Sequence, residues 1–397
     1  MISVEEARAR ILAGLAPAGV EIVALAAAYG RVLAVPVRAR VAHPPANVSA
    51  MDGYAVRAAD AAVGAQLRVV GEAPAGHPFV GAVGPGEAVR LFTGSFVPVG
   101  ADTILIQENG TAVPGGIIVD EAPAAGRHIR PQGQDFAMDD VLLAALHRLT
   151  VRDVGLAAAG NHPWVTVFRR PRVAILSTGD EISLPGEALG PGGIVNSNAA
   201  MLAAFVTGCG GEAVVLPAAG DDAAAIAAAA EAARGADILV TTGGASVGTH
   251  DLVQEGLGRQ GFALDFWKIA MRPGKPLIFG RVGAMPVLGL PGNPVSAYVC
   301  ATLFLAPAMA VMAGLPAAAP VFEAARLQGS LPANDLREDY LRARLSWQDG
   351  RLVAAAFGKQ DSAMLRPLAQ ADALIRRPPF QPALADGDAV EIIRLAL

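Results

Sequence analysis

The stretch from Thr241 to Asp251, TTGGASVGTHD, joins small residues, hydroxyls and a carboxylate at the end of an apolar run. The four residues before it are typical of a buried strand, and a helical pattern follows it. Gly243 and Gly244 would leave backbone N–H groups bare at a helix N-terminus, which holds anions, and Ser246 adds a hydroxyl donor. A divalent ion would resolve the repulsion between Asp251 and a phosphate. We therefore predict a phosphate-plus-metal site, with an ordinary tight turn as the alternative.

Further polar residues occur where other predicted strands end. They are carboxylates, cations and a hydroxyl, namely Asp180, Glu181, Asp221, Arg272, Lys275 and Ser296. Carboxylates with hydroxyls suit a divalent ion and phosphates. The Pro-Gly turn between Arg272 and Lys275 fixes where both cations point, which suits an oxyanion. Each residue alone could be a helix cap or a solvated charge, but their joint placement favours a site.

The elements that must position these residues alternate between strand and helix from about residue 169 onward. Strands are expected at 173–176, 213–216, 237–242, 277–279 and 287–290. Helices are expected between them, and a long one after Pro294. This alternation predicts a doubly wound α/β domain, in which ligands bind at the carboxyl ends of the strands.

The flanking parts of the chain follow other patterns. Ser3 with Glu6 predicts a capped first helix, residues 22–28 a second short helix, and Thr150 caps a third. Between 45 and 136 the apolar runs are short and β-like, and β-like runs return after 315. We predict four domains: 1–44 with 137–168 (helical and extended), 45–136 (mainly β), 169–314 (α/β) and 315–397 (small, β).

Bulk composition narrows the class of protein. The chain has 397 residues, of which 53% are hydrophobic and 17% charged, so it can pack sizeable cores. A net charge of −5 gives no basic field for nucleic acid. Cys209 and Cys300 resemble neither a disulfide framework nor a metal site. With no signal-peptide pattern and no uninterrupted apolar span, we expect a cytoplasmic protein that binds neither nucleic acid nor membrane.

Five motifs, spread in order over essentially the whole chain, resemble the signature set of the molybdopterin molybdenumtransferase family, which includes the bacterial MoeA proteins and the C-terminal domain of gephyrin. They are 49–55 (SAMDGYA), 177–181 (STGDE), 241–251, 272–276 (RPGKP) and 290–296 (LPGNPVS). The resemblance implies a multidomain α/β plus β homodimer with active sites between subunits. Its central domain would resemble molybdopterin adenylyltransferase, flanked by a mainly β domain, a helical/extended dimerisation domain and a C-terminal β-barrel-like domain.

The resemblance also implies a reaction and a set of roles. Adenylylated molybdopterin and molybdate would be the substrates, and Mg²⁺ would assist the release of AMP. The implied catalytic residues are Asp251, Glu181, Asp221, Asp52 and Lys275, with Asp251 a Mg²⁺ ligand and Glu181 a second candidate ligand. The pterin phosphate and nucleotide would lie on Gly243, Gly244 and Ser246. The implied molybdate pocket comprises Arg272, Lys275, Ser296, Arg342 and Ser362, and Pro276 is a further implied cofactor-binding residue.

From the partner subunit, the resemblance implies that Asp52, Thr93 and Asp135 reach the cleft. The sequence departs from the family at Asn196, where Asp is frequent, and at Asp361 beside Ser362. Two other functions stay open, the adenylyltransferase itself and a non-catalytic scaffold that binds molybdopterin or molybdate. The flanking β domains count against the first, and the intact acids and bases count against the second. Partner proteins would be a molybdopterin adenylyltransferase and molybdoenzyme maturation proteins.

Overall fold

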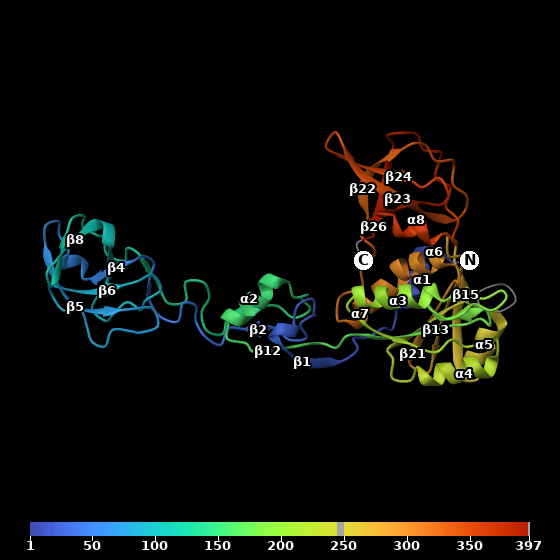
Figure 1. The fold of residues 1–397 in the computed structure, drawn as a ribbon, viewed down its shortest axis with the longest axis horizontal. Coiled ribbons are helices and arrows are strands. Elements are labelled where there is room, and N and C mark those ends of the chain that lie inside the picture. Colours follow the sequence, from blue (N-terminus) through green and yellow to red (C-terminus); the bar gives the residue numbers. More distant parts are fainter. Residues whose placement is uncertain (244–249, 396–397) are drawn as a thin grey trace. The chain divides into compact units, whose positions relative to one another are not determined.

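The computed structural model describes residues 1–243 and 250–395, which fold into two compact units. The first unit comprises Met1–Glu21, Gly30–Ala34 and Val167–Leu397. The second comprises Ile22–Tyr29 and Val35–Thr166. The predicted α/β and C-terminal domains belong to the first unit, and the predicted β domain to the second (Figure 1).

A six-stranded sheet forms the centre of the first unit. Its strand order is β16 (Glu212–Val215), β13 (Arg172–Ser177), β17 (Ile238–Thr242), β21 (Met285–Leu290), β20 (Pro276–Val282) and β18 (Phe262–Lys268). The first four strands run parallel, whereas β20 is antiparallel to both of its neighbours. The five predicted strands are therefore present, β20 among them as the antiparallel one, and β18 is an unpredicted strand at the edge.

Helices cover both faces of this sheet, which confirms the doubly wound α/β prediction. Val173 and Ile175 of β13 pack into one core, whereas Ala174 and Leu176 pack into the other, because successive side chains of a strand point to opposite faces. The first core takes in α1 (Val4–Leu12), α3 (Ser197–Gly208), α6 (Pro294–Cys300) and α7 (Ala306–Met312). The second takes in α4 (Ala223–Ala232) and α5 (His250–Gly258).

Helices α6 and α7 are continuous through a π-helical segment, Ala301–Leu305. Together the three segments form one helical run, Pro294–Met312. It is the one helix among the described residues that is long and apolar enough to cross a membrane. Its most apolar window is 72% buried inside the fold, where Leu303, Phe304 and Leu305 are fully enclosed. The run is therefore explained as the core helix of the α/β domain.

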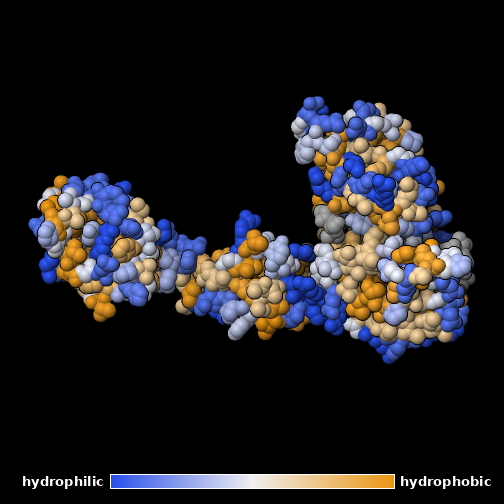
Figure 2. All heavy atoms as spheres, in the orientation of Figure 1, coloured by the Kyte–Doolittle hydropathy of each residue, from blue (hydrophilic) through white to orange (hydrophobic). Residues whose placement is uncertain are grey.

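The C-terminal segment of the first unit is a closed five-stranded barrel. Its strands are β22 (Glu323–Gln328), β23 (Glu338–Gln348), β24 (Arg351–Ala356), β25 (Ala373–Arg377) and β26 (Ala389–Arg394). The order β23-β24-β22-β26-β25 returns to β23, which also pairs with β19 (Met271–Arg272) of the α/β domain. A helix, α8 (Leu365–Ala369), follows the loop after β24. Figure 2 shows hydrophilic residues over much of the barrel surface, in keeping with exposed ion pairs such as Arg394–Glu323.

The second unit contains a six-stranded β sheet. Its order is β7 (Thr103–Ile106), β4 (Gly53–Val56), β6 (Glu87–Leu91), β5 (Gln66–Ala73), β9 (Gly116–Val119) and β8 (Gly110–Val113). Strands β8 and β9 form a hairpin, and Gly115 adopts φ +74° between them. Gly is suited to this left-handed conformation because it lacks a Cβ.

The rest of the second unit contains two pairs of short strands and one helix. The pairs are β2 (Val37–Arg38) with β11 (Val141–Leu143), and β3 (Val48–Ser49) with β10 (Ile129–Arg130). Thr150 caps the N-terminus of helix α2 (Val151–Ala159), as predicted, and it forms a full capping box with Asp153. Burial raises the pKa of Asp153, but hydrogen bonds from His147 and Thr150 outweigh it and lower that pKa to about 2.

The prediction of a helix at residues 22–28 was wrong. Val20–Ala24 forms a strand, β1, that pairs with β12 (Trp164–Phe168), and only Leu25–Ala27 makes a single 3₁₀ turn. Val and Ile in this segment suit a strand, and a partner strand more than 130 residues away cannot be read from local periodicity. The first helix, α1, is capped by Ser3, whose hydroxyl accepts a hydrogen bond from the Glu6 N–H over 3.0 Å.

Candidate active site

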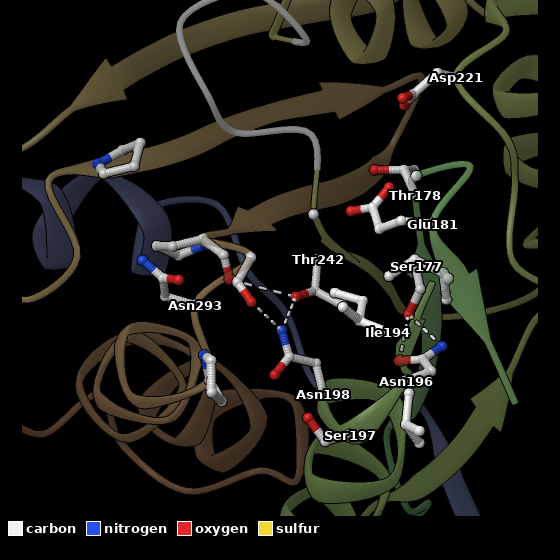
Figure 3. Close-up of a pocket in the computed structure, with 18 residues that line it drawn as sticks. Ser177, Thr178, Glu181, Ile194, Asn196, Ser197, Asn198, Asp221, Thr242 and Asn293 are labelled. Carbon is white, nitrogen blue, oxygen red and sulfur yellow. Dashed lines mark hydrogen bonds between the residues drawn. The ribbon is translucent and has the colours of Figure 1, made fainter. Parts of the chain in front are cut away.

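A pocket of about 690 Å³ opens where β13 and β17 of the α/β sheet end (Figure 3). Its walls come from the turn after β13, the segment 194–198 leading into α3, the end of β17 and the turn before α6. Its lining includes Thr178, Glu181, Asn198, Asp221, Gly243 and Asn293. The pocket thus lies at the carboxyl ends of parallel strands, where open α/β sheets bind ligands.

The structure brings four of the predicted site residues to this pocket. Glu181 and Asp221 contribute carboxylates, Gly243 contributes backbone, and Pro276 contributes its ring. Predicted Gly244 and Ser246 lie outside the described residues. The backbone of Asp251 falls in the first turn of α5, and its side chain also lies outside what the structure describes.

Close backbone approach explains why glycine stands at position 243. Gly243 has φ +98°, and a Cβ added there would lie 2.3 Å from the carbonyl oxygen of Thr178. Gly179 has φ +137°, a left-handed conformation that favours glycine, whereas the nearby Glu181 carboxylate could move aside for a Cβ. Both glycines therefore let the ends of β13 and β17 converge on the same pocket.

A buried polar network supports the pocket wall, and the sequence did not single it out. Asn196 caps α3 by accepting from the Ala199 N–H, and its amide nitrogen donates to the Ser177 hydroxyl over 2.9 Å. Asn198 donates to the Thr242 hydroxyl over 2.9 Å and to the Gly292 carbonyl over 2.7 Å. The two Asn residues two positions apart were a usable signal, because Asn inside a helical turn is a poor helix former that hydrogen-bonds locally.

Two buried side-chain oxygens of the pocket lining have no hydrogen-bond partner within residues 1–243 and 250–395. They are the hydroxyl oxygen of Thr178 and the amide oxygen of Asn198. The residues are 1% and 9% exposed, respectively. Unsatisfied buried polar atoms are uncommon in folded proteins and are costly, so each calls for a group that satisfies it.

The carboxylates of Glu181 and Asp221 are exposed, and Figure 3 shows them on the same side of the pocket as Thr178. Asp180 has another task, because its carboxylate accepts the Asp221 backbone N–H over 2.9 Å. Within residues 1–243 and 250–395, no group of three or more His, Cys, Asp or Glu side chains is assembled for a metal. Two carboxylates still fit Mg²⁺, which binds through one or two carboxylates together with substrate phosphates and water.

Arg272 does not line this pocket. It lies in a second cavity, of about 450 Å³, which it shares with residues of the C-terminal barrel. Its guanidinium forms ion pairs with Asp339 and, over 3.7 Å, with Asp335, and the hydrogen bond to Asp339 raises the pKa of Arg272. Lys275 is exposed beside Pro276, and no ion pair involves it among the described residues. The two predicted oxyanion-binding cations thus have different surroundings.

The other predicted molybdate residues occupy a junction between α6 and the barrel. Ser296 is buried inside α6 at 5% exposure. Ser362 accepts a hydrogen bond from Asn293 Nδ2 over 3.0 Å, and its carbonyl accepts from the Val295 N–H over 3.0 Å. Ser362 therefore joins the barrel loop to the turn that borders the first pocket, through Asn293.

The guanidinium of Arg342, which is predicted to contact the oxyanion, forms its hydrogen bonds within the C-terminal barrel. Its guanidinium is 1% exposed and donates to the carbonyls of Lys359, Asp361 and Met364 over 2.9–3.2 Å, and to the Gln360 side chain over 3.3 Å. Its hydrogen-bonding groups are thus directed into the loop 359–364. Arg342 orders the loop that carries Ser362, and it does not line the first pocket in this structure.

Asp52 and Thr93 meet within the second unit, as a pair. Asp52 Oδ1 accepts from the Thr93 backbone N–H over 2.7 Å and from its hydroxyl over 2.9 Å, and these bonds lower the pKa of Asp52. Asp135 lines a separate cavity of about 520 Å³ together with Gly94, next to Thr93, and with Arg130. The three residues predicted to act together therefore occur in one region of this unit.

Comparisons with known proteins cover the chain from end to end. Three family models match: the MoeA N-terminal region (domains I and II) at residues 2–160, a probable molybdopterin binding domain at 174–311, and the MoeA C-terminal region (domain IV) at 324–395. Curated relatives named molybdopterin molybdenumtransferase come from a Nostoc species (36% identical, covering 95% of this chain and 89% of that protein) and from Mycobacterium tuberculosis (35%, 93% and 94%). A crystal structure of a molybdopterin biosynthesis MoeA protein from Pyrococcus horikosii superposes with a TM-score of 0.88 at 29% identity, covering 99% of each chain.

Proposed function

The chain belongs to the molybdopterin molybdenumtransferase family, and we propose that it transfers molybdenum from molybdate into adenylylated molybdopterin, with Mg²⁺-dependent release of AMP. The family places the enzyme in molybdenum cofactor biosynthesis. The adenylylated form of the substrate, molybdate and Mg²⁺ are our proposal. The observation that carries it is the pocket at the ends of β13 and β17, which combines a glycine-lined turn with two exposed carboxylates.

The glycine-lined end of the pocket suits the phosphates of such a substrate. Gly243 allows backbone to approach closely there, and the unpartnered Thr178 hydroxyl can donate to a phosphate oxygen. Glu181 and Asp221 would hold Mg²⁺, with Asp251 as a third ligand by family resemblance. When bound, Mg²⁺ neutralises charge on the phosphoanhydride. In the proposed reaction, water adds to the phosphorus of the adenylate, and the bond between that phosphorus and the bridging oxygen breaks. The products are AMP and the pterin phosphate.

The cationic groups suit the second substrate, molybdate, which is a dianion. Lys275 is exposed next to Pro276 of the pocket lining, so its ammonium group can reach an incoming oxyanion. Arg272 would contribute once the oxyanion replaces its carboxylate partners. Ser296 and Ser362 would contribute hydroxyl groups, with Arg342 positioning the loop of Ser362.

We further propose a cytoplasmic homodimer in which the partner subunit supplies Asp52, Thr93 and Asp135 to each active site. The ready-made Asp52–Thr93 pair supports a preorganised contribution. A molybdopterin adenylyltransferase would supply the substrate, and molybdoenzyme maturation proteins would receive the product. The alternative, a non-catalytic scaffold of the same fold, is less favoured because the curated relatives are named as transferases.

The test is AMP release from adenylylated molybdopterin, with and without molybdate, over a range of Mg²⁺ concentrations. We expect molybdate-stimulated release by the wild type. Glu181→Gln and Asp221→Asn should each raise the Mg²⁺ concentration needed for half-maximal release by roughly tenfold or more, because a charged ligand is lost. Asp222→Asn is the matched control, since Asp222 caps α4 through the Ala225 N–H and Asn caps equally well. A folded wild type that releases no AMP would overturn the proposal and favour the scaffold.

A further inference from the structure

Asn198 has an amide whose orientation is fixed by its neighbours. Its nitrogen donates to the Gly292 carbonyl over 2.7 Å and to the Thr242 hydroxyl over 2.9 Å. A carbonyl oxygen can only accept, so the nitrogen must face Gly292 and the amide cannot be flipped. Figure 3 shows this nitrogen directed at Thr242 and the amide oxygen directed away from it.

The amide oxygen of Asn198 is left without a donor. It is buried, in a residue only 9% exposed, and it has no hydrogen-bond partner in the part of the chain that the structure describes. The neighbouring Asn196 provides a contrast, because its amide oxygen accepts from both the Ala199 N–H and the Ser177 hydroxyl. An acceptor that is oriented, buried and unsatisfied at a pocket wall is complementary to a ligand that carries a hydrogen-bond donor.

The chemistry of the substrates limits which group can be that donor. Phosphate oxygens and molybdate act as acceptors at neutral pH, so they would leave the Asn198 oxygen unsatisfied. The pocket also exposes apolar side chains, since Ile194 is 53% and Val195 43% exposed, and both line it. Apolar lining with a single directed acceptor suits the face and the N–H edge of a flat nitrogen heterocycle.

We propose that Asn198 is a specificity-determining residue that accepts an N–H hydrogen from a heterocycle of the bound substrate, in a pocket whose opposite side, at Thr178 and Glu181, takes the phosphates. This inference rests on the proposed function. Two heterocycles in the substrate carry such a donor, the amino group of adenine and the N–H groups of the pterin. The experiment distinguishes them.

The experiment measures equilibrium affinity by calorimetry for three probes: AMP, purine riboside 5′-monophosphate, which lacks the amino group, and molybdopterin. Wild type is compared with Asn198→Ala. Loss of one hydrogen bond should weaken the donor-bearing probe roughly 3- to 10-fold. If adenine is the donor, the affinity for AMP falls and the affinity for its analogue without the amino group does not. If the pterin is the donor, molybdopterin weakens and both nucleotides keep their affinity.

Asn196→Ala is the matched control, because it removes a neighbouring amide whose oxygen is already satisfied. It should change the affinities of all three probes by one common factor, as a mere distortion of the pocket would. A common factor for Asn198→Ala as well, or no change at all, would overturn the inference. If the alanine variant does not fold, Asn198→Ser takes its place in the experiment, because the serine hydroxyl can still form a hydrogen bond within the network.

Failure of the proposed function is read separately, from molybdate-stimulated AMP release by the wild type. A wild type without that release, but with an AMP-selective or pterin-selective effect at Asn198, would remove the reaction and keep the recognition role. A wild type with full release, but with no probe-selective effect, would keep the reaction and remove the role of Asn198.

Discussion

Asn293 donates its side-chain N–H to the hydroxyl of Ser362 over 3.0 Å, and this bond links the turn at the first pocket to the loop of the C-terminal barrel. A second bond runs in parallel, from the Val295 N–H to the Ser362 carbonyl. The family assigns Ser362 to substrate binding by resemblance. The structure adds that Ser362 directly contacts Asn293, which lines the pocket. A change in the barrel loop can therefore alter the pocket through this contact.

A double-mutant cycle measures this link. We expect Asn293→Ala and Ser362→Ala each to destabilise the protein by about 1 kcal/mol or less, because the bond is exposed. The coupling energy between them should be about 0.5–1 kcal/mol in urea unfolding. Ser330→Ala, elsewhere in the barrel, should show no coupling to Asn293→Ala. Additive effects of Asn293→Ala and Ser362→Ala would show that the bond does not form in solution.

Arg342 should be essential for the order of loop 359–364. Arg342→Met removes the donors to three loop carbonyls, and we expect a loss of roughly 3 kcal/mol or more because those carbonyls lose their partners. Arg342→Lys should recover only part of this, since an ammonium group cannot reproduce the guanidinium fork. Hydrogen exchange of amides 359–364 gives the local readout. Arg344→Met on the same strand, at an exposed position, is the control and should cost about 0.5 kcal/mol or less. Equal effects at the two positions would contradict the assignment.

Gly243 should tolerate no side chain. Gly243→Ala combines φ +98° with a Cβ 2.3 Å from the Thr178 carbonyl, so we expect a loss of roughly 3 kcal/mol or more, together with weaker AMP binding. Gly186→Ala separates the two effects, because Gly186 has φ +94° with no atom within 4 Å of the added Cβ. It should cost only the backbone strain, about 1–2 kcal/mol. Thermal unfolding of both variants decides whether overlap with the Thr178 carbonyl adds to that strain.

Asp335 should compete with molybdate for Arg272. Hydrogen bonds from the guanidinium and backbone N–H of Arg337 lower the pKa of Asp335 to about 2, below its ordinary value of 3.8. Because the folded-state pKa is the lower one, this contribution to stability is present above about pH 4 and is lost as the pH falls toward 2. With this low pKa, Asp335 is charged at both pH 6 and pH 9 and competes with the oxyanion at both. Asp335→Asn should therefore raise the affinity for molybdate by up to about fivefold, by the same factor at the two pH values. Asp349→Asn, in the turn between β23 and β24, should leave the affinity unchanged. A weaker affinity in Asp335→Asn would show that Asp335 supports the oxyanion site.

Local sequence signals predicted the α/β core well, and the particular residues show why. The strands β13, β17 and β21 are nearly continuous apolar runs, and Asn196 and Asp222 are strong helix caps, so each element is specified within its own segment. The strand β1 was missed because its partner β12 is remote in sequence, and the segment was predicted as a helix.

The site was predicted less completely than the fold. Glu181, Asp221, Gly243 and Pro276 do meet at one pocket, because they follow or begin strands of one sheet. Arg342 could not be understood from sequence, since its role depends on a loop about 20 residues away folding back onto it. Asn198, at the start of α3, carries no site signal in the sequence. Its distinguishing property, an unsatisfied oxygen, exists only once Gly292 and Thr242 have been brought to its nitrogen.

The closed barrel has a consequence for how other molecules can attach to it. Each of its five strands, from β22 to β26, is hydrogen-bonded to a strand on both sides over part of its length, so no strand of the barrel in the described chain has one side wholly unpaired. A free edge is where a foreign segment can be added to a sheet and where misassembly begins. Where both sides of its strands are paired, the barrel is therefore closed to recognition by strand addition and is protected from edge-to-edge aggregation. A protein that docks there must do so through side chains and loops.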